Sequence, residues 1–456
     1  MNYFSHFLAG AFSVSAVVGG AIASPANATR PNILLIISDD QRWDALGAAG
    51  NPAIHTPALD RLAAEGVYFR QGTIHTSLCM PSRATLLTGL PPHQHGWYSN
   101  QSQRPGLRSA NGFKGIATLP GLLEPAGYRT VLVGKWHLTP VPWNCGFSDV
   151  RTWFPRGDGP YVDLPLARGK SPETRVVKGF VTEVFADDAI EFLKSDAAKE
   201  KPFLLWLATT APHWPRQPNP DRIQKLYAGK SAQDLLPPGV PSAESSSADW
   251  TNYCAAITHL DEQVGRLLAT LENQKLADKT VVVFLGDNGY MMGERGWDGK
   301  VMPYESSVRV PFIVRAPMLP QRKGRSDAAV SSLDLPATLL SVAGVSPPKE
   351  WPGRNLVPLL RGGKASGFDE AICEFADEAG RNFGHLTYRL IRTPAHKLIR
   401  WRDPQKPDEL YDLMADPHEQ NNLANAPAAR RVRDDLLQRL QAWMERTSDP
   451  ARQWNK

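Results

Sequence analysis

The chain has 456 residues, 42% of them hydrophobic, and a formal net charge of +5 from 51 basic and 46 acidic side chains. This length and hydrophobic content can support one large core, or a large domain with a smaller companion. Acidic and basic residues are interspersed without dense basic runs, which argues against a nucleic-acid partner.

The N-terminal segment reads as a secretory signal peptide over residues 1–28. An apolar run from Phe7 to Ala23 precedes a small-residue tail that ends at Ala28, which is the pattern of a cleavage site. No Lys or Arg precedes the run, so an uncleaved anchor and a cytoplasmic chain stay as alternatives. Cleavage predicts a periplasmic or secreted protein, and no later stretch approaches the ~20 apolar residues that a membrane span needs.

Four apolar runs predict buried strands at residues 32–40, 130–137, 202–213 and 280–289. Helical stretches such as residues 250–272 separate them. Continuous apolar strands that alternate with helices indicate a parallel sheet covered on both faces. The predicted fold class is therefore α/β, with a large, mixed, mostly parallel sheet sandwiched by helices.

The rest of the chain predicts long loops and a second, smaller unit. Residues 138–173 and 215–248 are rich in Pro and show no clear periodicity, so we expect surface loops at the rim of a site. From residue 367 onward, short alternating runs and a terminal helix predict a small antiparallel sheet with one helix. The predicted domains are residues 29–366 and the subdomain 367–456.

Polar residues end each of the four predicted strands. Ligands of open α/β sheets bind beyond the carboxyl ends of the strands, so we expect these side chains to meet. Crowded carboxylates need a cation, and oxygen ligands favour a hard ion such as Ca²⁺ or Mg²⁺. Asp and Asn are also common turn residues, which is the alternative reading. The candidates are Asp39, Asp40, Lys135, His137, His213, Asp287 and Asn288.

The four cysteines are Cys79, Cys145, Cys254 and Cys373. They lie far apart without a CxxC pair, so neither a zinc site nor a dense disulfide framework is indicated. Cys79 stands at the predicted start of a helix, where backbone N–H groups favour anions and a thiol can become a nucleophile. If Cys79 is set aside, at most one disulfide can form among the other three.

The segment "CMPSRATLLTG" at residues 79–89 fits the C-x-P-S-R signature of the sulfatases, and the chain resembles that family over nearly its whole mature length. "SDD" precedes this signature, and "GKWH", "APH", "GDNG" and "GWDGKVMPYESSVRVP" follow it, in the family's order. The second signature position is Met80, where Ser or Cys is commoner. The resemblance implies an alkaline-phosphatase-like fold and oxidation of Cys79 to formylglycine by a separate formylglycine-generating maturation enzyme.

The resemblance also implies a set of metal ligands and an activity. One Ca²⁺ would be bound by the oxygen of the modified Cys79 together with Asp39, Asp40, Asp287 and Asn288. The implied activity is hydrolysis of sulfate esters in a sulfated small molecule or glycan.

Further residues acquire roles from the same motifs. Arg83 and Lys135 would steady the formylglycine, and His137 would act on its hydroxyl. His213 and Lys300 would meet the sulfate, with His213 as general acid for the leaving group. Within "YESSVRVP", Glu305 and Arg309 are instead interpreted as packing or ion-pair residues.

Substrate identity is less defined by the sequence. The stretch "LLTGLPPHQHGWYSN" resembles that of sulfatases acting on glycosaminoglycan sugars, and its His93, His95 and Trp97, with the Trp-rich residues 136–153, are candidates for sugar contact or for packing. Relatives with the same motif cleave phosphonate or phosphate esters, so such a hydrolase is the rival enzyme. An inactive protein that binds sulfated glycans is the rival from another class.

Overall fold

The computed structural model describes residues 30–100, 112–240, 247–320, 323–364, 366–377 and 383–454. The predicted signal peptide, residues 1–28, lies outside these ranges. The chain from Pro31 onward forms one compact unit. Within the described ranges, no helix combines the length and apolar character that crossing a membrane requires.

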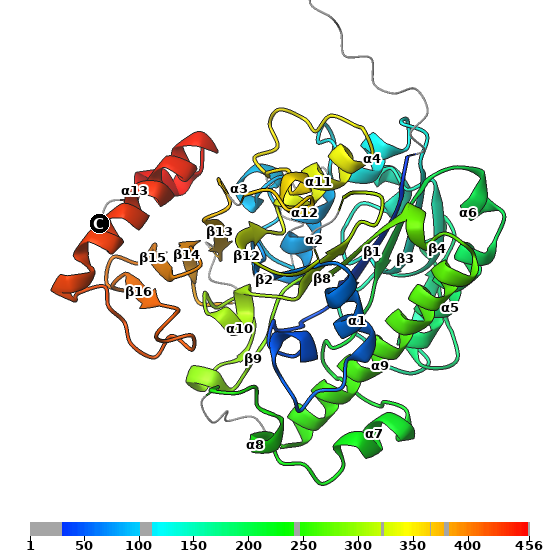
Figure 1. Cartoon of the computed structure of the whole chain (residues 1–456), viewed down its shortest axis with the longest axis horizontal. Coiled ribbons are helices and arrows are strands. Elements are labelled where there is room, and N and C mark those ends of the chain that lie inside the picture. Colours follow the sequence, from blue (N-terminus) through cyan, green and yellow to red (C-terminus); the bar gives the residue numbers. More distant parts are fainter. Residues whose placement is uncertain are drawn as a thin grey trace, which may run out of the picture. The chain divides into compact units, whose positions relative to one another are not determined.

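A mixed sheet of ten strands runs through the described structure in the order β12-β2-β11-β8-β1-β7-β3-β4-β5-β6 (Figure 1). The central strands β8, β1, β7, β3 and β4 are parallel to one another. The strands are β1 (Asn32–Ser38), β2 (Val67–Thr73), β3 (Arg129–Lys135), β4 (Asp149–Phe154), β5 (Pro165–Arg168), β6 (Thr174–Val176), β7 (Phe203–Ala208), β8 (Thr280–Gly286), β11 (Phe312–Arg315) and β12 (Gly324–Ser331).

The central strands are apolar throughout because both faces of the sheet are covered. All seven residues of β1 are buried. Ile33 and Leu35 enter the hydrophobic cluster on one face, whereas Leu34 and Ile36 enter the cluster on the other. The predicted α/β fold is therefore confirmed, and the four predicted strands correspond to β1, β3, β7 and β8.

Helices pack on both faces of this sheet. Apolar residues of α1, α5 and α9 join one cluster, and those of α2, α4 and α11 join the other. The helices are α1 (Pro57–Glu65), α2 (Cys79–Thr88), α3 (Pro92–His95), α4 (Leu119–Leu123), α5 (Val181–Lys194), α6 (Ala197–Glu200), α7 (Asp221–Tyr227), α8 (Ala232–Leu235), α9 (Ser247–Asn273), α10 (Glu305–Val308), α11 (Asp334–Val342), α12 (Val357–Leu360) and α13 (Arg430–Arg446).

The C-terminal residues form the predicted small antiparallel sheet and helix. Its strands are β13 (Ala371–Ala376), β14 (Thr387–Arg392), β15 (His396–Trp401) and β16 (Glu409–Asp412). Helix α13 packs on one face of this sheet through Leu436 and Leu440, which contact the cluster containing Ile391 and Leu398. The boundary between residues 366 and 367 stays a prediction.

The predicted loops at residues 138–173 and 215–248 are wrong in part. Strands β4 and β5 lie within the first and belong to the main sheet, because β4 pairs with β3 and buries Trp153 and Phe154. Helices α7 and α8 lie within the second. A two-stranded ribbon of β9 (Met291–Met292) and β10 (Asp298–Gly299) completes the described strands.

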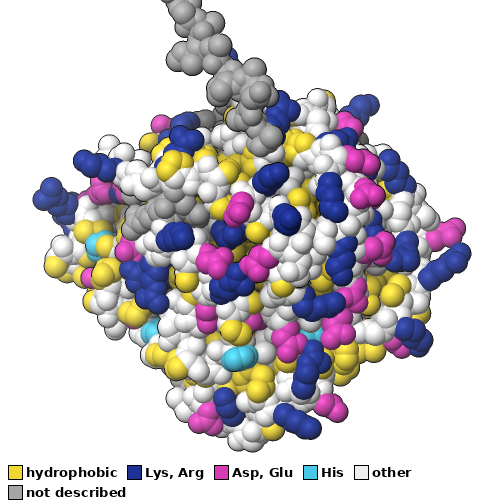
Figure 2. Space-filling model, turned by 45° about the vertical axis from the view of Figure 1, so that its right-hand side comes forward, with side chains coloured by type: hydrophobic (Ala, Val, Ile, Leu, Met, Phe, Trp, Pro, Cys, Tyr) yellow, Lys and Arg dark blue, Asp and Glu magenta, His cyan; other side chains and the backbone are white. Residues whose placement is uncertain are grey.

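The free cysteines agree with the expectation of no disulfide framework, and the surface carries charges of both signs. All four cysteines are free and buried, so the one disulfide that the sequence allowed is absent. On the face shown in Figure 2, basic and acidic side chains are intermixed and do not gather into an area of one sign.

Candidate active site

The carboxyl ends of four strands meet at one edge of the main sheet. Strands β1, β3, β7 and β8 are parallel neighbours, so their ends share that edge. The segments beyond them are hydrogen-bonded together: Asp39 N donates to Ala211 O (3.0 Å), and Asp287 N donates to Ser38 O (2.9 Å). The sheet therefore gathers the polar residues that the sequence placed after each strand.

Possible metal-ligand atoms gather at this edge: those of Asp39, Asp40, Cys79 and His213 all lie within 4.8 Å of one another. Asp40 N donates to Asp287 Oδ1 (3.2 Å), and Asn288 Nδ2 donates to Asp40 Oδ1 (2.6 Å). Asp40 Oδ2 and Asn288 Oδ1 are buried without a hydrogen-bond partner in the described structure. Buried polar atoms without partners are costly, and this donor set of carboxylate and amide oxygens fits a hard cation such as Ca²⁺.

Burial and mutual repulsion act on these acidic groups unequally. Burial raises the pKa of Asp39 despite the nearby Lys135. Burial and the charge of Asp39 raise the pKa of Asp287 to about 6. Burial opposes ionisation of Asp40 too, but the nearby Lys300, His213 and Lys135 together outweigh burial and hold the pKa of Asp40 well below its usual range. Burial therefore disfavours the ionised forms of Asp39 and Asp287, whereas neighbouring cations keep Asp40 ionised.

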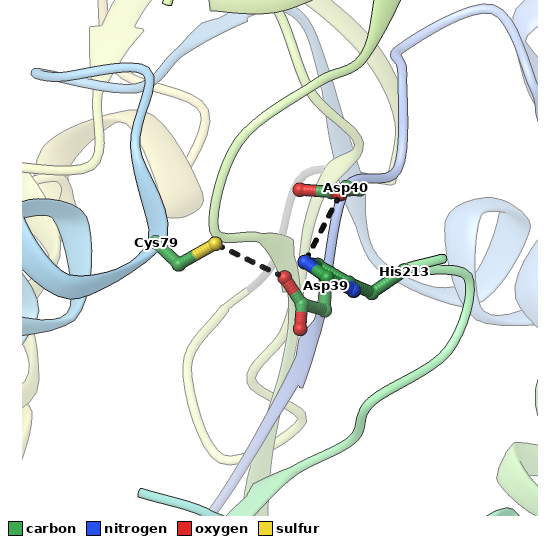
Figure 3. Close-up of side chains that lie close together, drawn as sticks. All are labelled: Asp39, Asp40, Cys79 and His213. Carbon is green, nitrogen blue, oxygen red and sulfur yellow. Dashed lines mark hydrogen bonds and ion pairs between the residues drawn. The ribbon is translucent and has the colours of Figure 1, made fainter. Parts of the chain in front are cut away.

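Cys79 is the first residue of α2, and its sulfur points at the carboxylates (Figure 3). Its Sγ lies 3.5 Å from Asp39 Oδ1, and Lys300 Nζ lies 2.8 Å from the same sulfur. Burial alone would raise the pKa of the Cys79 thiol, but Lys135 and Lys300 outweigh burial and lower it to about 7. The position suits a nucleophile in a field of positive charge.

Three basic side chains are fixed by the acidic groups. Lys135 Nζ forms an ion pair with Asp39. Arg83 Nε donates to Asp287 Oδ2 (2.9 Å), and its Nη1 donates to the Lys135 carbonyl oxygen (2.8 Å). Lys300 Nζ donates to Asp40 Oδ1 (2.6 Å). The predicted cations therefore surround the position of Cys79.

Two histidines flank the site in opposite protonation environments. His213 Nε2 lies 3.7 Å from Asp40 Oδ2 (Figure 3). Burial opposes protonation of His213, but the negative charges of Asp40 and Asp39 together outweigh burial and raise the pKa of His213. Burial and the charge of Lys135 lower the pKa of His137 well below its usual value. Titratable groups whose environments push their pKa values apart suit acid and base roles.

Comparison with known proteins decides which chemistry this geometry belongs to. A model of the family described as Sulfatase matches residues 31–345, which is more than half of the chain. The chain belongs to the sulfatase family. A second model, described as N-sulphoglucosamine sulphohydrolase, C-terminal, matches residues 293–446 of this sulfatase.

Relatives cover nearly the whole sulfatase. An ulvan-active sulfatase of Formosa agariphila is 30% identical over 425 residues, which cover 90% of this chain and 80% of the relative. A protein whose structure was solved with its substrate D-glucosamine-2-N,6-O-disulfate is 26% identical to this chain and superimposes with a TM-score of 0.76. The match covers 92% of this chain and 99% of that one. The sulfatase is therefore a sulfuric ester hydrolase with the expected fold.

A phosphonate monoester hydrolase of Agrobacterium radiobacter also shares the fold. It has a TM-score of 0.70 and 24% identity, and the match covers 92% of this chain and 96% of that one. This likeness concerns the fold alone. The fold by itself therefore does not separate sulfate from phosphonate chemistry.

The candidate sugar contacts near α3 are interior residues. His95 and Trp97 are fully buried, and the buried His93 side chain pairs with Glu374 of β13 (2.7 Å). Trp136 and Trp153 are each only 2% exposed. The structure supports the packing alternative for all five.

Three residues next to the candidate site residues were not singled out from the sequence. The hydroxyl of Tyr253 on α9 donates a hydrogen bond to the Asp40 carbonyl oxygen (2.7 Å). No local sequence pattern predicts this contact. In "PHWPRQ", Trp214 directly follows His213 and Arg216 stands three positions after it. An aromatic and a basic residue next to a candidate catalytic histidine are the signal that could have revealed these two.

Proposed function

We propose that this sulfatase hydrolyses sulfate esters of a sulfated carbohydrate, through a formylglycine made from Cys79 and with one bound Ca²⁺. The observation that carries the proposal is the position of the Cys79 sulfur, at the start of α2 between Lys300 and Asp39. Maturation requires a formylglycine-generating enzyme as partner. The signal-like residues 1–28 support the periplasm or the exterior of a bacterial cell as the location.

Ca²⁺ would be held by the oxygens of Asp39, Asp40, Asp287 and Asn288 together with the modified Cys79. The support is the pair of buried oxygens, Asp40 Oδ2 and Asn288 Oδ1, that accept no hydrogen bond in the described structure. When bound, the ion supplies positive charge that stabilises the charge developing on the sulfate oxygens. Formylglycine supplies an aldehyde whose hydrate carries two hydroxyl groups, one to attack sulfur and one to release sulfate afterwards.

The chain's own side chains orient the reactants and move the protons. Lys300 contacts both Cys79 and Asp40, so it is placed to bind a sulfate oxygen next to the nucleophile. His213, whose proton Asp40 stabilises, donates a proton to the leaving alcohol oxygen. His137, held neutral by burial and nearby cations, accepts the proton of the second hydroxyl.

A carbohydrate substrate is supported by the relatives. One acts on ulvan, and the solved relative holds a disulfated glucosamine. The rival is phosphonate or phosphate-ester hydrolysis at the same site, supported by the shared fold of the phosphonate monoester hydrolase.

The test compares hydrolysis of a matched aryl sulfate, aryl phosphate and aryl phosphonate, with D-glucosamine-2-N,6-O-disulfate and ulvan oligosaccharides as sugar substrates. The protein is made together with a formylglycine-generating enzyme and assayed with Ca²⁺, and the mass of the Cys79 peptide reports the modification. Sulfate preference that is lost in Cys79→Ala supports the proposal. Preference for a phosphorus ester would overturn the substrate class, and a modified but inactive protein that binds sulfated sugar would favour the binding protein.

A further inference from the structure

Trp214 is an exposed aromatic residue directly beside the candidate general acid His213. Its side chain is 61% exposed. The other large hydrophobic residues exposed in the described structure are aliphatic: Val176, Leu226, Met318 and Met414. Single exposed apolar residues are common on proteins, so the position of Trp214 and the rigidity of its backbone decide its meaning.

The backbone around Trp214 is held from two sides. The His213 carbonyl oxygen accepts hydrogen bonds from Tyr161 Oη (2.8 Å) and from Arg216 N (3.2 Å). The Trp214 carbonyl oxygen contacts His213 Nδ1 at 2.8 Å. An exposed side chain on a fixed backbone loses less entropy when a ligand orders it.

Arg216 anchors the segment on the interior side. It is only 2% exposed, and its guanidinium lies over the rings of Tyr253 (5.3 Å) and Tyr290 (4.5 Å). Tyr253 in turn hydrogen-bonds the Asp40 carbonyl oxygen. Arg216 is thus held against Tyr253, which contacts the backbone of Asp40. Trp214, two residues before Arg216, is exposed to solvent.

The chemistry of the proposed reaction places the leaving group beside His213, the residue that precedes Trp214. A general acid must lie within hydrogen-bond reach of the oxygen that it protonates, so the leaving alcohol lies on the His213 side of the sulfate. If that alcohol belongs to a sugar, its ring extends away from the scissile bond past His213. The apolar C–H face of a pyranose matches an indole face in size and polarity.

We propose that Trp214 forms a stacking subsite for the sugar ring that carries the scissile sulfate. The inference rests on the proposed function for its substrate class, and it adds a residue that orients the leaving group. Stacking contacts of this kind are worth about tenfold in binding, or about 1.4 kcal/mol.

The first experiment measures binding, which needs no turnover. Cys79→Ala protein, with and without Trp214→Ala, is titrated calorimetrically with D-glucosamine-2-N,6-O-disulfate and with inorganic sulfate. We expect Trp214→Ala to weaken binding of the sugar about tenfold and to weaken inorganic sulfate by much less. Trp214→Phe retains most of the affinity because it keeps an aromatic face, and Met414→Ala, which removes a distant exposed side chain, changes neither affinity.

A second experiment compares kcat/KM of the mature enzyme and its Trp214→Ala variant on the sugar sulfate and on a short alkyl sulfate. The loss on the sugar exceeds the loss on the alkyl ester by about tenfold if the subsite exists. Equal losses on both esters, or equal sugar affinity in both binding backgrounds, would overturn the subsite. Failure of the proposed function is distinguishable, because the wild-type enzyme would then prefer phosphorus esters while sugar binding could still depend on Trp214.

Discussion

Lys300 Nζ lies 2.8 Å from the Cys79 sulfur, which makes it the cation in closest contact with the proposed nucleophile. A unit charge about 4 Å from developing charge contributes roughly 4 kcal/mol at an effective dielectric near 20, or about three decades in rate. We therefore expect Lys300→Ala to fold normally and to lose about a thousandfold in kcat/KM, measured on an aryl sulfate. Lys275→Ala, which removes an exposed lysine, serves as the control. A rate within a few-fold of wild type would remove Lys300 from the site.

Ca²⁺ should stabilise the folded protein through the unpartnered oxygens of Asp40 and Asn288. A ligand at free concentration c that binds only the native state raises the free energy of unfolding by RT ln(1 + c/Kd), so we expect Ca²⁺ well above its Kd to raise the Tm of chelator-treated protein by several degrees. Asp40→Asn should lose most of this shift, whereas Asp163→Asn, which changes a carboxylate paired with Lys178 at the surface, should keep it. An unchanged shift in Asp40→Asn would contradict the assigned ligand, and a larger shift with Mg²⁺ would change the assigned ion.

Gly157 limits where the His137 ring can lie. A methyl group at this position would lie 2.5 Å from His137 Nε2, a separation that forces the ring to move. Because displacements of about 1 Å can cost about a hundredfold in rate, Gly157→Ala should lower kcat on that scale with little loss of stability. Gly265→Ala, whose added carbon meets Ala58 at an ordinary 3.4 Å, is the control. Normal turnover in Gly157→Ala would show that His137 has no positional role.

The pair of His93 and Glu374 should make stability depend on pH. His93 Nδ1 lies 2.7 Å from Glu374 Oε2. Burial opposes protonation of His93, but the charge and hydrogen bond of Glu374, together with the charge of Asp449, outweigh burial and raise the pKa of His93 above 6.5. Burial likewise opposes ionisation of Glu374, but the charges of His93 and Arg389 lower its pKa below 4.5.

The directions of the two pKa shifts define the pH range in which the pair stabilises the fold. The His93 contribution is complete below pH 6.5 and is lost as pH rises through its raised pKa. The Glu374 contribution is complete above pH 4.5 and is lost as pH falls through its lowered pKa. His93→Gln should therefore cost roughly 3 kcal/mol of unfolding free energy at pH 5.5 and clearly less at pH 9, measured by urea unfolding. A cost of His93→Gln that does not change with pH would refute the charged pair.

Much of the fold was readable because the central strands are buried on both faces. The uninterrupted apolar run of β8, for example, admits few other interpretations once its length and flanking turn residues are considered. Strand β5 was missed because it has only four residues with exposed ends, and such a strand is defined by its neighbours in the sheet. Short strands of this kind carry no periodic signal of their own.

The residues of the candidate site likewise fall into those that the sequence predicts and those that only the fold brings together. Asp39, Lys135 and Asp287 could be predicted because each stands at the carboxyl end of a recognisable strand: Lys135 is the last residue of β3, and Asp39 and Asp287 directly follow β1 and β8. Tyr253 was not, because it lies 213 positions from Asp40, whose carbonyl it contacts. The sequence left His93 and Trp97 as candidates for either sugar contact or packing, because an aromatic or imidazole side chain suits a sugar and a core equally well, and only the packing decides between them.

Glu305 shows that the small C-terminal sheet cannot be exchanged independently of the rest of the chain. Glu305 stands five residues after Lys300 in the chain. Its buried carboxylate contacts Arg392 of β14 (2.8 Å) and Lys397 of β15 (3.3 Å). A chimera that took residues 367–456 from a relative without matching partners would leave this buried acid unpaired. Recombination between sulfatases should therefore succeed only where the segment around Lys300 and the C-terminal sheet are inherited together.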